Sequence, residues 1–243
     1  KFYSVHRPIM YNKVIPSTWM ETGMGFRGEV PSMDGLSYFL YASSGLSSDA
    51  AGAAKHANGK WNVRSTRPGL REKDGNDSLA WSARLAYEQA YKHGEFSGSV
   101  SSYLTDYQYG SGQSTGMQLF DIEARYLFQN GLELIADYAW WNIDDPTVMQ
   151  DNQVGERIDG YRLELAYHHR MGKNKLVPFI RAEGYDLSSN GSYAGYTEAG
   201  SNNYLTYGAM YKLGYTWELK AAVRQSLDDD DGTEFSFGVG FQF

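Results

Sequence analysis

The chain has no cysteine in 243 residues, and this absence removes several kinds of chemistry at once. Disulfide bonds, thiolate catalysis, thiolate metal sites and c-type haem attachment all require cysteine and are excluded. Long apolar runs are missing too. Hydrophobic residues make up 42% of the chain, the mean hydropathy is −0.53, and no stretch approaches the about 18 consecutive apolar residues of a membrane-spanning helix. The sequence therefore does not encode a helical membrane protein.

Positive charge is also in short supply. The chain carries 22 lysines and arginines against 29 aspartates and glutamates, a formal net charge of −7. No basic stripe stands out, which argues against a nucleic-acid partner. The five histidines are scattered and there is no recognisable serine-nucleophile motif, so no nucleophile, base and orienting group are expected to converge. We therefore expect neither an enzyme nor a bound cofactor.

Aromatic residues and glycine are what the chain has in quantity, with 20 tyrosines, six tryptophans and 27 glycines. Residues 235–243, FSFGVGFQF, alternate strictly between apolar and small or polar residues. Strand side chains point alternately to two faces, so this pattern predicts a strand with one wholly apolar face. A closed barrel in lipid needs such an outer face, and we interpret the segment as the closing strand of an outer-membrane β-barrel.

The same alternation predicts about eleven antiparallel strands, starting near residues 18, 36, 78, 96, 117, 132, 158, 176, 203, 217 and 234. Short turns, of which Asn130-Gly131 is the clearest, alternate with long connections near residues 47–77, 109–116, 145–157, 188–202 and 228–233. Bacterial barrels have even strand numbers, short periplasmic turns and long extracellular loops. We therefore expect that N-terminal strands are missing from this sequence and that residues 1–17 lie outside the cell. The alternative is that residues 1–14 form a twelfth strand.

Charged residues recur on one face of nearly every predicted strand. A charge that faces lipid at mid-membrane costs about 2–4 kcal/mol, so we expect the charged face to line the interior. Each of these charges can tune solute passage or pair with a neighbour to brace the wall, and for any single arginine we favour pairing. The predicted pore-lining residues are Arg27, Arg84, Asp121, Glu123, Arg125, Glu133, Asp137, Arg162, Glu164, Arg181, Glu183, Lys220 and Arg224.

Two runs near the N-terminus resemble a known family. Residues 6–26, HRPIMYNKVIPSTWMETGMGF, and GLSYFLY at residues 35–41 with SGL at residues 44–46 are similar to the phosphate-selective porins O and P. The resemblance implies a sixteen-stranded, usually homotrimeric channel in the outer membrane of Gram-negative bacteria, where lipid and lipopolysaccharide surround it. Such channels pass small solutes or ions, and some prefer phosphate or other anions. In that family the motif lies inside a longer chain, in agreement with the missing strands.

The solute stays open at this point. An anion-selective channel is expected to carry a dense ladder of lumen arginines and lysines, whereas the predicted interior contains at least as many carboxylates. Inward tyrosines such as Tyr41, Tyr103 and Tyr185 keep a carbohydrate or other organic-solute channel as an alternative. Aromatic residues near strand ends, including Trp140 and Trp141, are expected to anchor at the membrane interface. A further alternative is a structural or interaction barrel whose lumen is plugged.

The connection at residues 47–77 carries the strongest local positive charge. A loop of this length is often functional. Its guanidinium groups could fold into the pore as a constriction that binds phosphate or carboxylate, or remain a surface loop that contacts lipopolysaccharide. The residues concerned are Lys60, Arg64, Arg67 and Arg71.

Two segments invite a metal-site interpretation that their spacing does not favour. Residues 228–231 are four consecutive aspartates, but they lack the alternating ligands of a calcium loop, so we interpret them as a solvated turn. His168 and His169 are adjacent on a predicted strand and point to opposite faces, so they cannot bind one ion together. No metal site is predicted.

Overall fold

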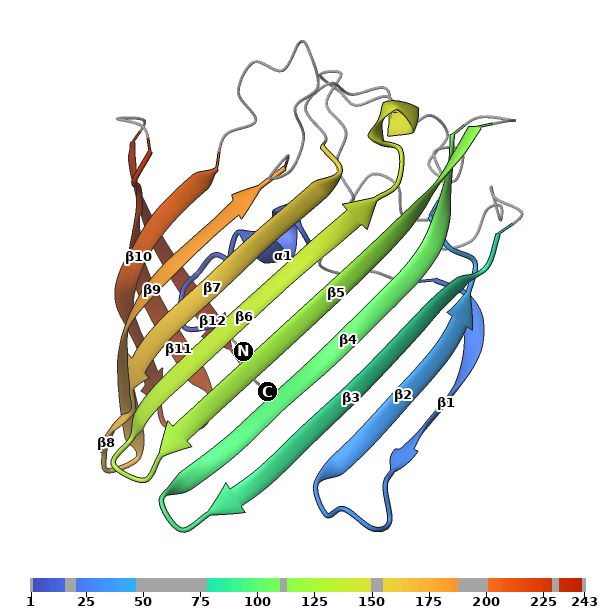
Figure 1. Cartoon of the computed structure of the whole chain (residues 1–243). Coiled ribbons are helices and arrows are strands. Elements are labelled where there is room, and N and C mark those ends of the chain that lie inside the picture. The colour runs from blue at the N-terminus through green and yellow to red at the C-terminus, as the bar shows by residue number, and fades with distance from the viewer. Residues whose placement is uncertain are drawn as a thin grey trace.

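The computed structural model describes residues 2–15, 21–46, 78–109, 113–149, 155–187, 201–228 and 232–241. One curved antiparallel sheet dominates it (Figure 1), and its path follows the chain from β1 to β12, with the short β8 paired to β9. Within these ranges two short helices accompany the sheet, α1 at Met10–Lys13 and a 3-10 helix at Pro146–Met149. The strands are β1 Gly23–Glu29, β2 Leu36–Ser43, β3 Ala80–Tyr91, β4 Gly94–Tyr109, β5 Gln113–Phe128, β6 Leu132–Ile143, β7 Arg157–Tyr167, β8 His169–Met171, β9 Asn174–Asp186, β10 Asn202–Leu213, β11 Trp217–Ser226 and β12 Thr233–Phe241.

The all-β, barrel-like fold predicted from the alternation is confirmed, and eleven of the described strands follow one another along the sheet. β1 begins at Gly23 rather than near residue 18. The long connection predicted at residues 109–116 is wrong, because β4 and β5 have 16 residues each and occupy most of it. Small residues of the two strands pair in register, and the side chains of Tyr107 and Met117 are buried on one face of the pair. This packing outweighs the turn propensity of the local sequence.

β8 is the continuation of β7. Ala166 pairs with Phe179 and His169 pairs with Leu176, so both strands share one register on β9. The interruption falls opposite Pro178, which has no N–H to donate to the ladder. The tight turn before β6 is formed as predicted, and Gly131 has a φ of 91° there, a left-handed conformation that suits glycine.

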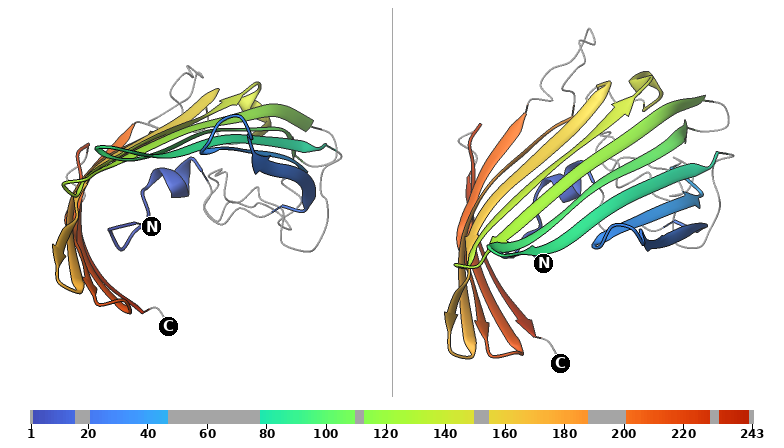
Figure 2. Two further views of the ribbon diagram at one scale, coloured as in Figure 1. Left: turned by 90° about the horizontal axis from the view of Figure 1, so that it is seen from below. Right: turned by 60° about the horizontal axis from the view of Figure 1, so that its bottom comes forward.

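The sheet curves strongly, and Figure 2 shows residues 2–15 with α1 on its concave side. β1 and β12 are the two edges and lie apart, each with a single neighbouring strand among the described residues. No helix in the described part of the chain has the length and apolarity to cross a membrane.

Residues 2–15 contradict the prediction of a twelfth strand at the N-terminus. They lie against the concave face and contain α1 instead of a strand. Met10 and Val14 are one helical turn apart and completely buried in a cluster with Trp141 and Ile158. Burial of this apolar pair explains the position, because the hydrophobic core lies between the segment and the sheet.

Candidate functional site: the concave face

The two faces of the sheet have opposite polarity. On the convex face Trp81, Leu163 and Phe235 are 58%, 56% and 79% exposed, whereas Arg181 and Glu183 on the concave face are 0% exposed. Directly paired residues of an antiparallel sheet share a face. The register therefore places all the predicted pore-lining residues on the concave face, namely Arg27, Arg84, Asp121, Glu123, Arg125, Glu133, Asp137, Arg162, Glu164, Arg181, Glu183, Lys220 and Arg224.

Arg181 on β9 is the centre of the most buried ion network. Its Nη1 is 3.3 Å from Oε2 of Glu164 and its Nη2 is 3.0 Å from Oε1 of Glu183. Nη1 also donates to the hydroxyl of Ser4 at 2.9 Å, which links the N-terminal segment to the wall. Arg224 on β11 approaches the same Glu183 carboxylate at 3.8 Å. Two arginines and two carboxylates thus neutralise one another under the segment.

A second network lies between α1 and strands β6 and β7. Arg162 Nε is 2.6 Å from Oδ2 of Asp137, so the pairing expected for this arginine is present. Tyr11 donates its hydroxyl to the same oxygen at 2.8 Å, and its ring lies 5.5 Å from the Arg162 guanidinium. Burial raises the pKa of Tyr11, and the Asp137 charge raises it further. The docked phenol is therefore neutral and acts as a donor.

A third network anchors the beginning of the segment. Glu133 on β6 accepts a hydrogen bond from the Tyr3 hydroxyl and pairs with Arg125. His168 Nε2 lies 2.6 Å from Glu133 and 2.9 Å from the Tyr3 hydroxyl. Burial raises the pKa of Tyr3, and the hydrogen bond to Glu133 adds to this effect. The neighbouring His169 instead stacks on the ring of Tyr167. The two histidines therefore point to opposite faces of the sheet, as predicted.

Backbone groups of the segment are also bound by side chains of the wall. The Ile9 N–H donates to Glu183 at 2.6 Å, the Trp141 indole donates to the carbonyl of Val14 at 2.9 Å, and Lys220 donates to the carbonyl of Phe2. The interface role predicted for Trp141 is therefore wrong, since its side chain is fully buried on the concave face. Trp140, its neighbour, stacks on Phe120.

Sequence reasoning missed the docking residues of the N-terminal segment. The side chains and backbone groups concerned belong to Tyr3, Ser4, Ile9, Tyr11 and Val14. Their partners are more than a hundred positions away along the chain, as with the separation of 174 residues between Ile9 and Glu183. The available local signal was the apolar pair Met10 and Val14 at helical spacing within a polar stretch.

The inward tyrosines are mostly packed rather than available to a sugar. Tyr103 is 7% exposed, donates to Glu21 at 2.7 Å and meets Trp141 edge-on. Tyr185 lies under the Lys13 ammonium group at 5.5 Å. Tyr41 differs, because it stacks on Phe39 with ring centroids 5.5 Å apart on β2.

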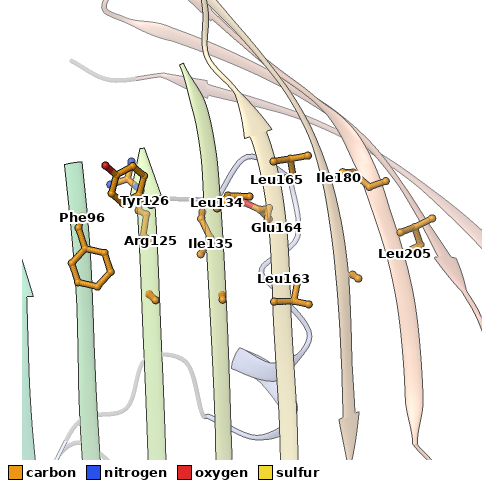
Figure 3. A pocket seen from close by; sticks show the side chains of 13 residues that line it. Phe96, Arg125, Tyr126, Leu134, Ile135, Leu163, Glu164, Leu165, Ile180 and Leu205 are labelled. Carbon is orange, nitrogen blue, oxygen red and sulfur yellow. The ribbon is translucent and has the colours of Figure 1, made fainter. Parts of the chain in front are cut away.

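The convex face carries an apolar hollow of about 560 Å³ (Figure 3). Ala124 and Ala136 are directly paired across β5 and β6 and leave room between larger neighbours. The larger side chains around them include Leu163, Leu165 and Ile180, which project from β7 and β9. The hollow adds to the apolar character of this face.

Several predicted groups lie outside the described residues. They are Lys60, Arg64, Arg67 and Arg71 of the long connection and Asp229–Asp231 of the aspartate run. Asp228 is described, and it accepts hydrogen bonds from the backbone and side-chain amides of Asn203. Within the described ranges, no group of three or more histidine, aspartate and glutamate side chains is arranged to hold a metal ion.

Comparison with known proteins gives little beyond the geometry. No family model matches the chain. An uncharacterized protein of Aquifex aeolicus (strain VF5) is 23% identical over 248 residues, which cover 94% of this chain and 54% of that protein. The chain therefore spans about half the length of this relative.

Proposed function

We propose that the protein is an outer-membrane porin, a passive channel for small hydrophilic solutes in Gram-negative bacteria. The observation that carries this proposal is the inverted polarity of the curved sheet, with exposed apolar side chains outside and buried or paired charges inside. A strand wall in lipid needs an apolar outer face and a polar inner one. A soluble β-protein would place its charges on the outside.

In this proposal residues 2–15 narrow the lumen. The hydrogen bonds and ion pairs described for the segment connect it to residues of strands β6 to β12 and to His168, which precedes β8. We call strands β6 to β12 the docking half of the concave face. Strands β1 to β5 form the opposite half. A segment held along one side of the wall restricts the passage without needing to fill it.

The resemblance to phosphate-selective porins adds three further proposals. They are a homotrimer, a surrounding of outer-membrane lipid and lipopolysaccharide, and a preference for phosphate or other anions. The mixed charges of the concave face favour a weak ion preference, because most arginines of the docking half already have a carboxylate partner.

A structural or interaction barrel with a plugged lumen is the second candidate. The fully buried contacts of Arg181 with Ser4, Glu164 and Glu183 favour it, because they hold the segment firmly inside the wall. Both candidates share the same fold and differ in whether ions pass.

The test is the current through the full-length protein in a planar lipid bilayer under a salt gradient, repeated with phosphate in place of chloride. The porin proposal predicts stepwise conductance with weak ion preference, and the reversal potential gives its sign. A heat-unfolded sample serves as the control. Inserted, folded protein that passes no current would contradict the porin and favour the plugged barrel.

A further inference from the structure

Two arginines flank a phenylalanine on the opposite half of the concave face. Arg27 on β1 and Arg84 on β3 are each directly paired with Phe39 on β2, so all three side chains share a face. Side chains in such a row are about 4.5–5.5 Å apart at Cβ. The three residues line a hollow of about 430 Å³, together with Gly28, Glu29, Ser37, Tyr38 and Ala86.

The positive charge of this row is available to a ligand. Arg84 has a carboxylate neighbour at 3.8 Å, Glu123, and both side chains are well exposed. Arg27 is exposed, and no carboxylate of the described residues lies within ion-pair distance of it. In the docking half, by contrast, the Arg181 guanidinium is completely buried between two carboxylates.

The aromatic part of the row is available as well. Phe39 is 38% exposed even though its ring stacks on Tyr41, with an interplanar angle of 18°. An exposed ring between two cationic side chains favours a partner that is planar and apolar on one side and negatively charged on the other. The volume of the hollow lies in the range of about 300–1,000 Å³ typical of small-molecule sites.

We infer that this hollow is a binding site for aromatic carboxylates of the benzoate type. The carboxylate accepts charge-assisted hydrogen bonds from Arg27 and Arg84, and the ligand ring packs against Phe39. The inference rests on the proposed channel, in which the hollow would be a solute-binding position on the wall. Binding itself can nevertheless be measured without any current.

Glu29 allows the direction of a change in benzoate affinity to be predicted. Among the described residues that line the hollow it is the one carboxylate, and it lies two positions from Arg27 on the same strand face. Its charge repels a bound carboxylate, so Glu29→Gln is expected to strengthen benzoate binding. A ligand that carried its own amine would lose affinity in the same variant.

In the experiment, benzoate, acetate and inorganic phosphate are each titrated into the folded full-length protein in detergent. Calorimetry measures the binding of each ligand. The double variant Arg27→Gln/Arg84→Gln is expected to weaken benzoate binding about tenfold or more, since charge-assisted hydrogen bonds are lost. Phe39→Leu is expected to weaken benzoate binding about threefold and to leave acetate binding unchanged. Lys212→Gln, on the concave face away from the hollow, is the matched control.

Three results would overturn the inference, namely benzoate binding that survives the double variant, equal effects of Phe39→Leu on benzoate and acetate, and phosphate binding tighter than benzoate binding. Gel mobility before and after heating shows that each variant is folded. Benzoate binding without conductance in a bilayer would reject the porin and retain the site. Conductance without benzoate binding would reject the site and retain the porin.

Discussion

The docking half and the opposite half of the concave face use the same residue types in different ways. In the docking half, Arg162 and Arg181 are buried and each has a carboxylate within 3.3 Å. In the opposite half, Arg27 and Arg84 are exposed, and the Arg84 pair with Glu123 spans 3.8 Å, whereas Arg125 on β5 pairs closely with Glu133 of the docking half. Arg162 and Arg181 contact residues 2–15 directly, and this packing excludes water from the two guanidinium groups. The buried charges of Arg162 and Arg181 brace the wall, whereas Arg27 and Arg84 keep exposed side chains.

Removing a buried cation is expected to have the largest effect. Arg181→Leu leaves Glu164 and Glu183 buried without their partner, which typically costs about 3–5 kcal/mol of unfolding free energy. The matched variant Arg84→Leu removes an exposed, loosely paired arginine and should cost less than about 1 kcal/mol. Urea unfolding of both variants in lipid vesicles measures the difference. Equal midpoints would mean that the two halves do not differ as described.

Steric displacement of α1 is expected to have the next largest effect. A Cβ at Gly160 would lie 2.8 Å from Cγ2 of Val14 and 3.2 Å from Cβ of Met10. Gly160→Val should therefore loosen residues 2–15 at a cost of about 1–3 kcal/mol, a typical penalty for overpacking. Trypsin cleavage after Lys13 measures the loosening. Ala136→Val, next to the hollow on the convex face, is the control and should leave the cleavage rate unchanged.

Alkaline pH is expected to have a smaller effect on the same segment. The pKa values of Tyr3 and Tyr11 are raised when the segment is docked, whereas undocked phenols ionise near about pH 10. Their contribution is therefore complete below about pH 10 and is lost as the pH rises toward the raised values. Subtilisin cleavage of the segment should accelerate above about pH 10.

The control for the pH effect is the double variant Tyr3→Phe/Tyr11→Phe. It retains the lysines that also titrate in this range, but it has no phenols in the segment. Its cleavage rate should change less between pH 9 and pH 11 than that of the original protein. An identical change in both proteins would remove the tyrosines from the account.

The strands were predictable because their signal is local. Strict alternation assigned Asp121 and Glu123 to one face and Phe120 to the other, and the register agrees. The packing of α1 was not predictable in this way. A helix of four residues has little propensity signal, and its position depends on partners such as Asp137 and Glu183 that are distant in sequence.

The features of the candidate site also divide into those that follow from local sequence and those that depend on distant contacts. Membership of the charged face followed from alternation alone, as did the separation of His168 from His169. Which charges are paired and which are exposed depends on where residues 2–15 dock, and only the three-dimensional structure gives that. Trp141 shows both parts: alternation places it on the same face of β6 as Glu133 and Asp137, but its contact with Val14 depends on where the N-terminal segment docks.

The central claim is that residues 2–15 narrow a channel while staying docked, and an engineered disulfide tests it most directly. The chain has no cysteine of its own. In Met10→Cys/Gly160→Cys the new Cβ would lie 3.2 Å from that of residue 10, close to the about 3.5–4.5 Å of a disulfide, and Val14→Ala makes room. We predict that the oxidised variant forms the bond and conducts ions as well as the reduced one. Loss of conductance on oxidation, with recovery on reduction, would contradict the claim and identify the segment as a plug.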